Sequence, residues 1–281
     1  MKISVNTVIC MGVIVIVSYV PGLPIDIGLS DIASAVSAGS KVTKGNIQIT
    51  IKEEQEIGRE TAASVLGRYE LYDDTGTQKY VSLVGYTLTK KIYHSDYDFK
   101  FGVLKTDIVN AFACPGGYVF ITTGLLKFLQ NEAQLAGVLA HEISHITQRH
   151  IIKEIEKSYR TSTLIEALQD VSGEKYRALI GETSNLSTMI LFRGLNKKDE
   201  YEADMLGIKL VHQCGYDANE FVEFLNRLKV ESNTAKTGDA AIIRTHPNIN
   251  ARIRKITKRI QKNKYKKGEK NESRYHKNLG F

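Results

Sequence analysis

The sequence predicts an α+β protein that is mostly helical and contains one small β-sheet. β-rich runs are confined to residues 98–122, and nearly all of the chain after Gly124 has apolar residues at helical spacing. Hydrophobic residues make up 42% of the 281 residues, which is enough for a substantial core. No internal repeat and no long Gly/Ser/Pro linker divides the chain, so we expect one catalytic-sized domain over residues 46–262.

Residues 1–45 are expected to be a signal peptide or N-terminal anchor with a lead-in. The apolar run from Val8 to Val20 follows Lys2 and ends at Pro21. Its length suits an export signal and falls short of the roughly 20 residues that cross a bilayer. No second run of spanning length follows. The prediction is therefore an exported bacterial protein, periplasmic or envelope-associated, soluble or N-terminally anchored.

Positive charge is concentrated at the C-terminus. The segment from Arg252 to Phe281 holds 12 of the 38 Lys and Arg residues and two of the 31 acidic residues. Low hydrophobicity with high charge predicts a solvated helix end and a basic, disordered tail over residues 263–281. The functional alternative is attraction of this tail to an anionic membrane surface. A terminal basic segment with only scattered tyrosines gives no reason to expect nucleic-acid binding.

The first predicted elements are two helices and a hairpin. Residues 53–69 and 79–93 have helical spacing of apolar side chains. The runs FKFGVL, IVNAFA and YVFITT then read as strands, and the CPGG between the last two predicts a β-hairpin with a Pro-Gly turn. The edge strand around Asn110, Ala111 and Phe112 is the expected substrate-binding element, because an extended peptide can add to an unpaired edge. The alternative is a hairpin that only covers the core.

The helix that starts at Asn131 carries the chemistry. Asn131 and Gln134 resemble a capping box at its start. His141 and His145 are four residues apart, hence roughly 6 Å apart along the axis and able to reach one metal ion. Glu142 is turned toward a water molecule beside that ion. This is the HExxH arrangement of zinc hydrolases. The structural alternative is two ordinary histidines and a helix-favouring glutamate.

A catalytic zinc site needs a third protein ligand, and the segment from Asn196 supplies a candidate. Glu200 and Asp204 fall on or beside the buried stripe of this helix, whereas Glu202 points nearly the opposite way, toward solvent. A carboxylate facing a core is costly unless it is paired or bound to metal, so Glu200 is the candidate ligand. Asp204 could fix the tautomer of a ligand histidine. A buried salt bridge is the alternative.

Four motifs together resemble the zinc metallopeptidase family of BepA, LoiP, HtpX and the CAAX prenyl endopeptidase. They are NAFACPGGYVFITTGLL, LAGVLAHEISHITQRH, DEYEAD and THPNINARI, in that order. The likeness covers residues 51–260, and the chain looks like the exported, soluble, BepA-like branch, without the C-terminal TPR repeats of BepA. The resemblance implies a gluzincin (zincin-like) domain holding one Zn²⁺ per chain. It implies His141, His145 and Glu200 as ligands, Glu142 as catalytic base and Asp204 in support.

His246 and Arg252 match the HP…R segment of the same family. The simplest interpretation is a helix-entry turn, because Pro247 suits a helix start. In the functional interpretation, either side chain stabilises the oxyanion, or His246 fills the open coordination position and keeps the enzyme latent. A fourth protein ligand would convert an open site into a closed one.

The other histidines are interpreted as surface or packing residues. His94, His212 and His276 have no partner at ligand spacing. His150 is one residue out of register with His145 on a continuous helix, so it is not expected at the same metal. The sequence leaves open whether Cys114 and Cys214 form a disulfide, although two lone cysteines in a large core are more often unpaired.

The function predicted from these residues is a zinc-dependent endopeptidase. Its expected substrates are misfolded or unassembled envelope proteins, because edge-strand binding does not depend on side-chain identity. A zinc-stabilised binding or chaperone-like protein with little proteolysis is the alternative, and a membrane-surface adaptor acting through the tail is a third. The sequence leaves the cleavage specificity and the oligomeric state open.

Overall fold

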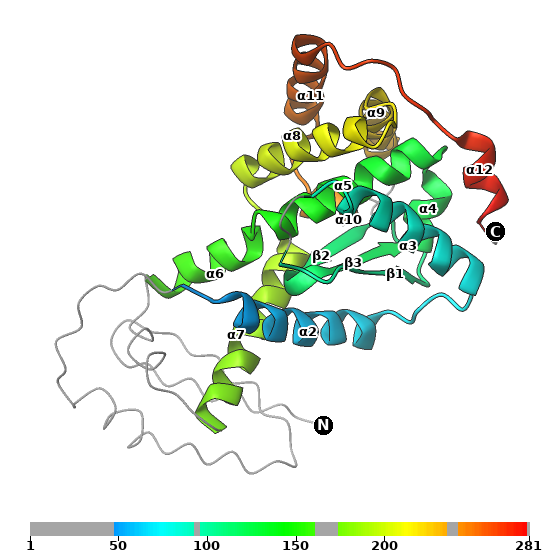
Figure 1. Ribbon diagram of the computed structural model, residues 1–281. Helices are drawn as coiled ribbons and strands as arrows, with labels where there is room; N and C mark the ends of the chain where they lie inside the picture. The colour runs from blue at the N-terminus through cyan, green and yellow to red at the C-terminus, as the bar shows by residue number, and fades with distance from the viewer. Residues whose placement is uncertain (1–47, 93–95, 161–173, 235–240, 280–281) are drawn as a thin grey trace. The chain divides into compact units, whose positions relative to one another are not determined.

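The computed structural model describes residues 48–92, 96–160, 174–234 and 241–279 (Figure 1). Residues 46–281 form one compact unit. The export signal expected in residues 1–45 lies outside the described residues, as does His94. Within those ranges, no helix has both the length and the apolar character that crossing a membrane requires.

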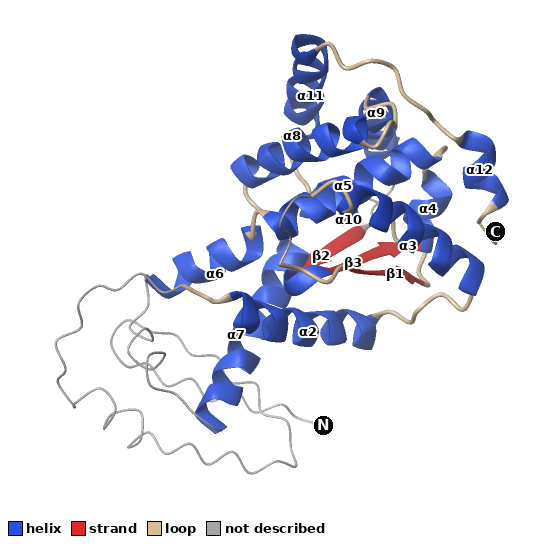
Figure 2. Cartoon of the chain, viewed as in Figure 1, coloured by secondary structure: helices blue, strands red, loops and turns tan. Residues whose placement is uncertain are grey.

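Helices dominate the described chain, as the apolar spacing predicts (Figure 2). In chain order they are α2 (Ile51–Arg68), α3 (Thr75–Thr89), η1 (Pro115–Gly117), α4 (Thr123–Phe128), α5 (Glu132–Thr147), α6 (His150–Arg160), α7 (Glu174–Arg193), α8 (Lys197–Gln213), α9 (Asn219–Thr234), α10 (Ala241–Thr245), α11 (Ile249–Asn263) and α12 (Glu272–Lys277). The predicted helices 53–69 and 79–93 correspond to α2 and α3, with ends that differ by one to four residues.

The sheet has three strands in the order β1-β3-β2. The strands are β1 (Lys100–Leu104), β2 (Ala111–Cys114) and β3 (Tyr118–Thr122). β2 and β3 form the predicted antiparallel hairpin, and β1 pairs with β3 in parallel. The turn requires Gly116, whose φ of +72° lies in the left-handed region.

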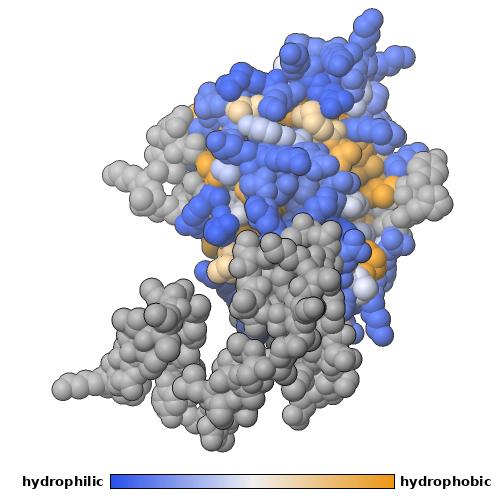
Figure 3. Space-filling view, turned by 90° about the vertical axis from the view of Figure 1, so that its left-hand side faces the viewer, coloured by the Kyte–Doolittle hydropathy of each residue, from blue (hydrophilic) through white to orange (hydrophobic). Residues whose placement is uncertain are grey.

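Alternate side chains of the strands enter two separate cores. Ala111 and Ala113 face the core that contains α3 and α5, whereas Phe112 and Cys114 face the core that contains α2 and α7. Figure 1 shows α5 and α2 on opposite sides of the sheet. Cys114 and Cys214 both carry free thiols. The described surface in Figure 3 is mostly hydrophilic, with apolar atoms in patches between polar ones.

The segment after α11 differs from the disordered tail that its composition predicts. Residues 264–279 are described and contain α12. The Tyr275 side chain is fully buried and its hydroxyl donates a 2.5 Å hydrogen bond to the Leu126 carbonyl. Arg274 forms an ion pair with the buried carboxylate of Glu132 on α5. One buried aromatic ring and a complementary carboxylate order a segment whose average composition gives no sign of packing.

Candidate metal centre

Helix α5 presents both histidines of the HExxH motif to the interior. Its start is fixed by Asn131, whose side-chain oxygen accepts a 2.9 Å hydrogen bond from the Gln134 N–H. His141 and His145 are each 3% exposed, and their Nε2 atoms lie 3.0 Å apart. Two buried imidazole nitrogens at this separation are close enough to bind one metal ion together.

Helix α8 crosses α5 closely enough to add carboxylates to the histidines. Gly207 marks the crossing, because a Cβ there would lie only 3.2 Å from the His141 backbone nitrogen. One and two turns earlier on α8, Asp204 and Glu200 are both fully buried. Glu200 Oε1 is 3.4 Å from His145 Nε2. The structure thus places Glu200 and Asp204 beside the histidine pair.

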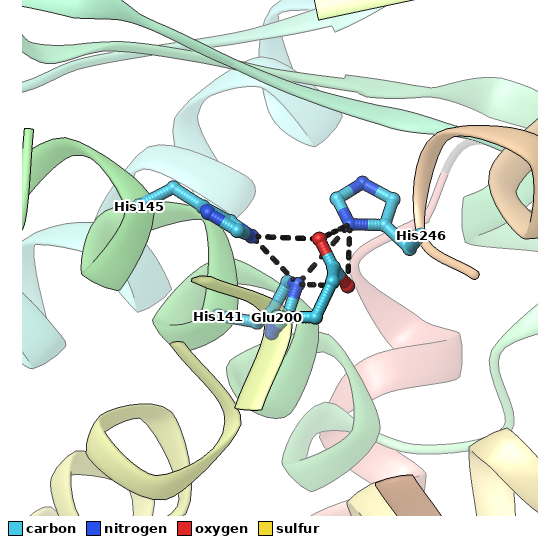
Figure 4. A group of neighbouring side chains, drawn as sticks. All are labelled: His141, His145, Glu200 and His246. Carbon is cyan, nitrogen blue, oxygen red and sulfur yellow. Dashed lines mark hydrogen bonds and ion pairs between the residues drawn. The ribbon is translucent and has the colours of Figure 1, made fainter. Parts of the chain in front are cut away.

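His246 enters the same site from the end of α10. Its Nδ1 is 3.2 Å from His141 Nε2 and 3.1 Å from Glu200 Oε1. Figure 4 shows the three imidazoles and the Glu200 carboxylate pointing toward one common position. The helix-entry turn interpretation of His246 therefore does not account for its side chain, which belongs to the cluster.

The donor set fits a zinc ion. His141, His145, Glu200 and His246 each offer one ligand atom, and these atoms lie within 4.8 Å of one another. Zn–N and Zn–O bonds of about 2.0–2.1 Å in a tetrahedron place neighbouring ligand atoms about 3.3 Å apart. Separations between ring nitrogens and carboxylate oxygens of these four residues run from 3.0 Å to 3.6 Å. Nitrogen and carboxylate oxygen are also the ligand types that zinc prefers.

Asp204 and Arg252 support His141 from behind the ligand atoms. His141 Nδ1 is 3.1 Å from Asp204 Oδ1. Burial, followed by the charge of Arg252, lowers the pKa of His141 to about 4, so its ring is neutral as a metal ligand requires. Burial would raise the pKa of Asp204, but Arg252 and His141 together outweigh that effect and lower it. The neutral ring therefore donates from Nδ1 to a carboxylate, which leaves Nε2 free to bind metal.

Glu200 and His246 shift each other's protonation. Burial alone would raise the pKa of Glu200, but His246 and Arg252 outweigh it and hold the pKa well below its usual value. Burial alone would lower the pKa of His246, and the carboxylates of Glu200 and Glu142 outweigh it and raise the pKa. The negative charge of Glu200 and the positive charge of a protonated His246 thus stabilise each other.

Glu142 lies at the edge of the cluster. Its side chain is 3% exposed, and Oε1 is 3.6 Å from Nε2 of His246. The position one residue after His141 brings its carboxylate close to the cluster without making it a member of the four-residue ligand group. This is the placement that a proton acceptor beside a metal ligand needs.

The expected substrate edge is present but covered. Among the described residues β2 pairs with β3 alone, and all residues of β2 are buried. The Phe112 ring packs 5.4 Å from that of Phe192 on α7. The Ile242 N–H of α10 donates to the Val109 carbonyl, and Thr245 Oγ1 donates to Asn110 Oδ1 at 3.2 Å. The sequence gives no sign that α7 and α10 lie against this strand.

His150 differs from its predicted role. It was expected to have no partner at ligand spacing, but its Nδ1 lies 2.8 Å from Nδ1 of His145. The expectation assumed one continuous helix, whereas α5 ends at Thr147 and Arg149 has a left-handed φ of +55°. Burial, followed by the charge of His145, lowers the pKa of His150 to about 3. Glu202, expected to be a solvated charge, is 3.4 Å from His150 Nε2.

Comparison with known proteins agrees with this site. Residues 76–260 match peptidase family M48. The chain is 28% identical to the beta-barrel assembly-enhancing protease of Escherichia coli (strain K12) over 217 residues, which are 75% of this chain and 44% of that protein. It is 33% identical to the mitochondrial metalloendopeptidase OMA1 of Schizosaccharomyces pombe over 184 residues, which are 64% of this chain and 52% of that protein. The chain spans about half the length of these relatives.

Proposed function

The chain belongs to peptidase family M48, and from this premise we propose that it is a zinc-dependent endopeptidase. The observation that carries the proposal is the set of four buried or nearly buried ligand atoms at tetrahedral separations, with Glu142 beside them. Helices α5 and α8 and the residue that follows α10 supply these ligands, which a chance pair of core histidines would not explain.

His141, His145 and Glu200 would hold one Zn²⁺ per chain. Zinc in such a site polarises a carbonyl and lowers the pKa of water toward neutrality. Glu142 accepts the proton from the attacking water and passes it to the leaving amine of the cleaved peptide bond. Asp204 orients His141 by accepting its Nδ1–H.

Arg252 is proposed as a positioning residue in place of the oxyanion-stabilising role expected from the sequence. Its Nε and Nη2 donate to Asp204, and its Nη1 is 3.0 Å from Glu200 Oε2. The side chain is 3% exposed, so its donors are used by the two carboxylates that support the metal. This leaves His246 as the remaining candidate for a direct role at the reaction centre.

His246 is proposed to fill the fourth coordination position and keep the site latent. The close approach of its Nδ1 to His141 and Glu200 supports this role over that of an oxyanion stabiliser. A fourth protein ligand occupies the position that water needs. The neighbouring bonds from α10 to Val109 and Asn110 cover the same edge that a substrate would use. Release of this segment would therefore open the ligand position and the strand together.

The proposed substrates are misfolded or unassembled proteins of the bacterial envelope. An extended backbone that adds to β2 would pass beside the metal ligands, and such pairing selects unfolded segments more than a particular side chain. The relatives named for beta-barrel assembly are consistent with such substrates. An exported location belongs to the same proposal.

Contact with an anionic membrane surface is also proposed, through α11 in place of a disordered tail. Lys258, Arg259 and Lys262 are exposed on this helix, and each basic residue near an anionic surface contributes about 1 kcal/mol of attraction. Sedimentation with anionic and neutral vesicles tests it. Replacement of all three residues by Glu should abolish binding to the anionic vesicles and leave sedimentation with the neutral vesicles unchanged.

Degradation of casein tests the peptidase proposal. The wild type should cleave casein, and 1,10-phenanthroline should stop the reaction. Glu142→Gln should keep one zinc per chain while losing about 100-fold or more of the rate, because general-base catalysis contributes about 10²–10⁴-fold. Full activity of Glu142→Gln would refute the assignment. Binding of zinc and casein without cleavage by both the wild type and His246→Ala would favour the chaperone-like alternative.

A further inference from the structure

The helix breaks just after the second metal-ligating histidine. α5 ends at Thr147, and α6 begins at His150. Between them, Arg149 adopts a left-handed φ of +55° that a residue other than glycine rarely takes. Its guanidinium is held by an ion pair of 2.6 Å from Nε to Glu54 Oε2. This break turns His150 back toward α5, where a continuous helix would carry it away.

The result is a direct contact between two buried imidazoles. His145 Nδ1 and His150 Nδ1 lie 2.8 Å apart, and the side chains are 2% and 0% exposed. Two ring nitrogens at this distance require one proton between them, because two N–H groups would repel and two lone pairs would too. Which ring carries that proton decides whether His145 can bind metal.

The metal-binding atom of His145 fixes the answer. Its Nε2 faces the ligand cluster, 3.0 Å from His141 Nε2. A neutral imidazole that binds metal through Nε2 must carry its proton on Nδ1. His150 Nδ1 is then the acceptor, and the remaining proton of His150 sits on Nε2. That N–H points to Glu202, whose Oε2 is 3.4 Å away.

We propose that His150 is a positioning residue for the zinc ligand His145, with Glu202 as its anchor. This inference rests on the proposed metal site. Groups that accept a hydrogen bond from a metal-bound histidine fix its tautomer and ring orientation. The two ligand histidines are thus supported differently: His141 by the carboxylate of Asp204, and His145 by a neutral imidazole.

The same geometry argues against a second cation at His150. His150, Asp199 and Glu202 could hold a metal ion by distance alone. A cation bound to His150 Nε2 would remove the proton from that nitrogen, while Nδ1 already accepts from His145. His150 would then be an imidazolate anion. The positioning role and the second cation are therefore mutually exclusive as long as His145 is a neutral ligand.

The ring tautomers of the zinc-loaded wild type give the first test. Long-range ¹H–¹⁵N correlation spectra of histidine-labelled protein report which ring nitrogen carries the proton. We expect the Nδ1–H form for His145 and the Nε2–H form for His150. An Nδ1–H form of His150 would overturn the proposal, as would a zinc titration that ends at two equivalents per chain with His150 bound.

Zinc affinity gives the second test, through competition with a chromogenic chelator. His150→Leu removes the acceptor and should weaken zinc binding about 10–100-fold. His150→Gln can still accept through its side-chain oxygen and should recover most of that loss. His212→Leu is the matched control, because His212 stacks on Tyr265 away from the cluster. Equal zinc affinity of His150→Leu and the control would overturn the proposal.

Substitution by Co²⁺ separates positioning from general damage to the fold. The visible absorption of bound Co²⁺ reports ligand geometry, so His150→Leu should change the spectrum and His150→Gln should restore it. Both variants should show the same thermal transition when zinc is saturating. None of these measurements uses a substrate, so their results can be interpreted even if the protein proves not to be a peptidase.

Discussion

Arg252 grips Asp204 through two parallel hydrogen bonds, 2.9 Å from Nε to Oδ2 and 2.7 Å from Nη2 to Oδ1. Arg252 lies on α11 and Asp204 on α8, and the third donor nitrogen of the guanidinium reaches Glu200. This planar, bidentate contact supports the carboxylate that accepts from His141 and one metal ligand at once. The position of α11 is therefore coupled to the geometry of the metal centre.

Arg252→Lys should weaken zinc binding even though the charge is kept. A lysine offers a point charge and cannot hold two carboxylate oxygens of Asp204 while reaching Glu200. We expect a loss of about 10-fold in zinc affinity, measured by chelator competition. Arg252→Met should in addition destabilise the metal-free fold by about 3–5 kcal/mol in urea titrations, because two buried carboxylates lose their partner. Wild-type zinc affinity of Arg252→Lys would contradict this account.

His246→Ala should raise the peptidase activity of the protein. If His246 is the fourth ligand, removing its imidazole would open that coordination position, while His141, His145 and Glu200 would remain to hold the metal. The rate of casein cleavage by His246→Ala, normalised to zinc content, should exceed that of the wild type several-fold.

An unchanged or lower rate, at one zinc per chain, would reject latency and support oxyanion stabilisation by His246. Zinc content is the necessary control, because a variant that has lost its metal would be inactive for a different reason. Phenanthroline should inhibit the variant as it inhibits the wild type.

Gly207 sets how closely α8 approaches α5, so enlarging it should disturb the metal centre. An added Cβ would lie 3.2 Å from the His141 nitrogen and 3.3 Å from its Cα. Gly207→Val should cost roughly 1–3 kcal/mol of stability through overpacking and should also lower zinc affinity. Gly67→Ala on α2 is the control, since a Cβ there meets nothing within 4 Å. Equal thermal shifts for the two variants would contradict the proposed close crossing.

The features that the sequence predicts are those encoded by residues close together in the chain. The CPGG turn joins strands only four residues apart in the chain, and His141 with His145 follows from helix periodicity alone. Glu200 was identifiable because a carboxylate on an apolar stripe is costly without a partner. The resemblance to a metallopeptidase family indicates that these separate segments form one site. The periodicity of each segment alone gives no information about contacts between segments.

The features that the sequence did not reveal depend on breaks and on distant contacts. The change of direction at Arg149 carries no glycine or proline signal, and it depends on Glu54, 95 residues earlier. Because His150 was placed on a continuous helix, its contact with His145 was missed. The covering of β2 by α7 and α10 carries no local signal either, since these segments begin 60 or more residues after β2 ends.

Acid should weaken the docking of the C-terminal segment through Glu132. Burial would raise the pKa of this carboxyl, but hydrogen bonds from Arg274, Tyr216 and Tyr80 outweigh it and lower the pKa below 4.5. A depressed folded-state pKa adds stability that is fully present above the unfolded-state pKa and is lost as the pH falls through the folded-state value. The stability gap between the wild type and Glu132→Gln, measured by urea titration, should therefore be largest above pH 4.5 and shrink below it. A gap that stays constant between pH 3 and pH 7 would refute this linkage.

Tyr275→Ala should destabilise the whole domain, although the residue lies in the segment that composition marks as a disordered tail. Its ring is completely buried between α3 and α5 neighbours, and its hydroxyl bonds to the Leu126 carbonyl. Truncating a large aromatic side chain in a packed core costs about 3–5 kcal/mol. Lys277→Ala, an exposed position on the same helix, is the matched control and should stay within about 0.5 kcal/mol of the wild type. If the two variants unfold at the same urea concentration, the ordered packing of α12 makes no contribution to stability, and the basic segment behaves as the solvated tail that its composition predicts.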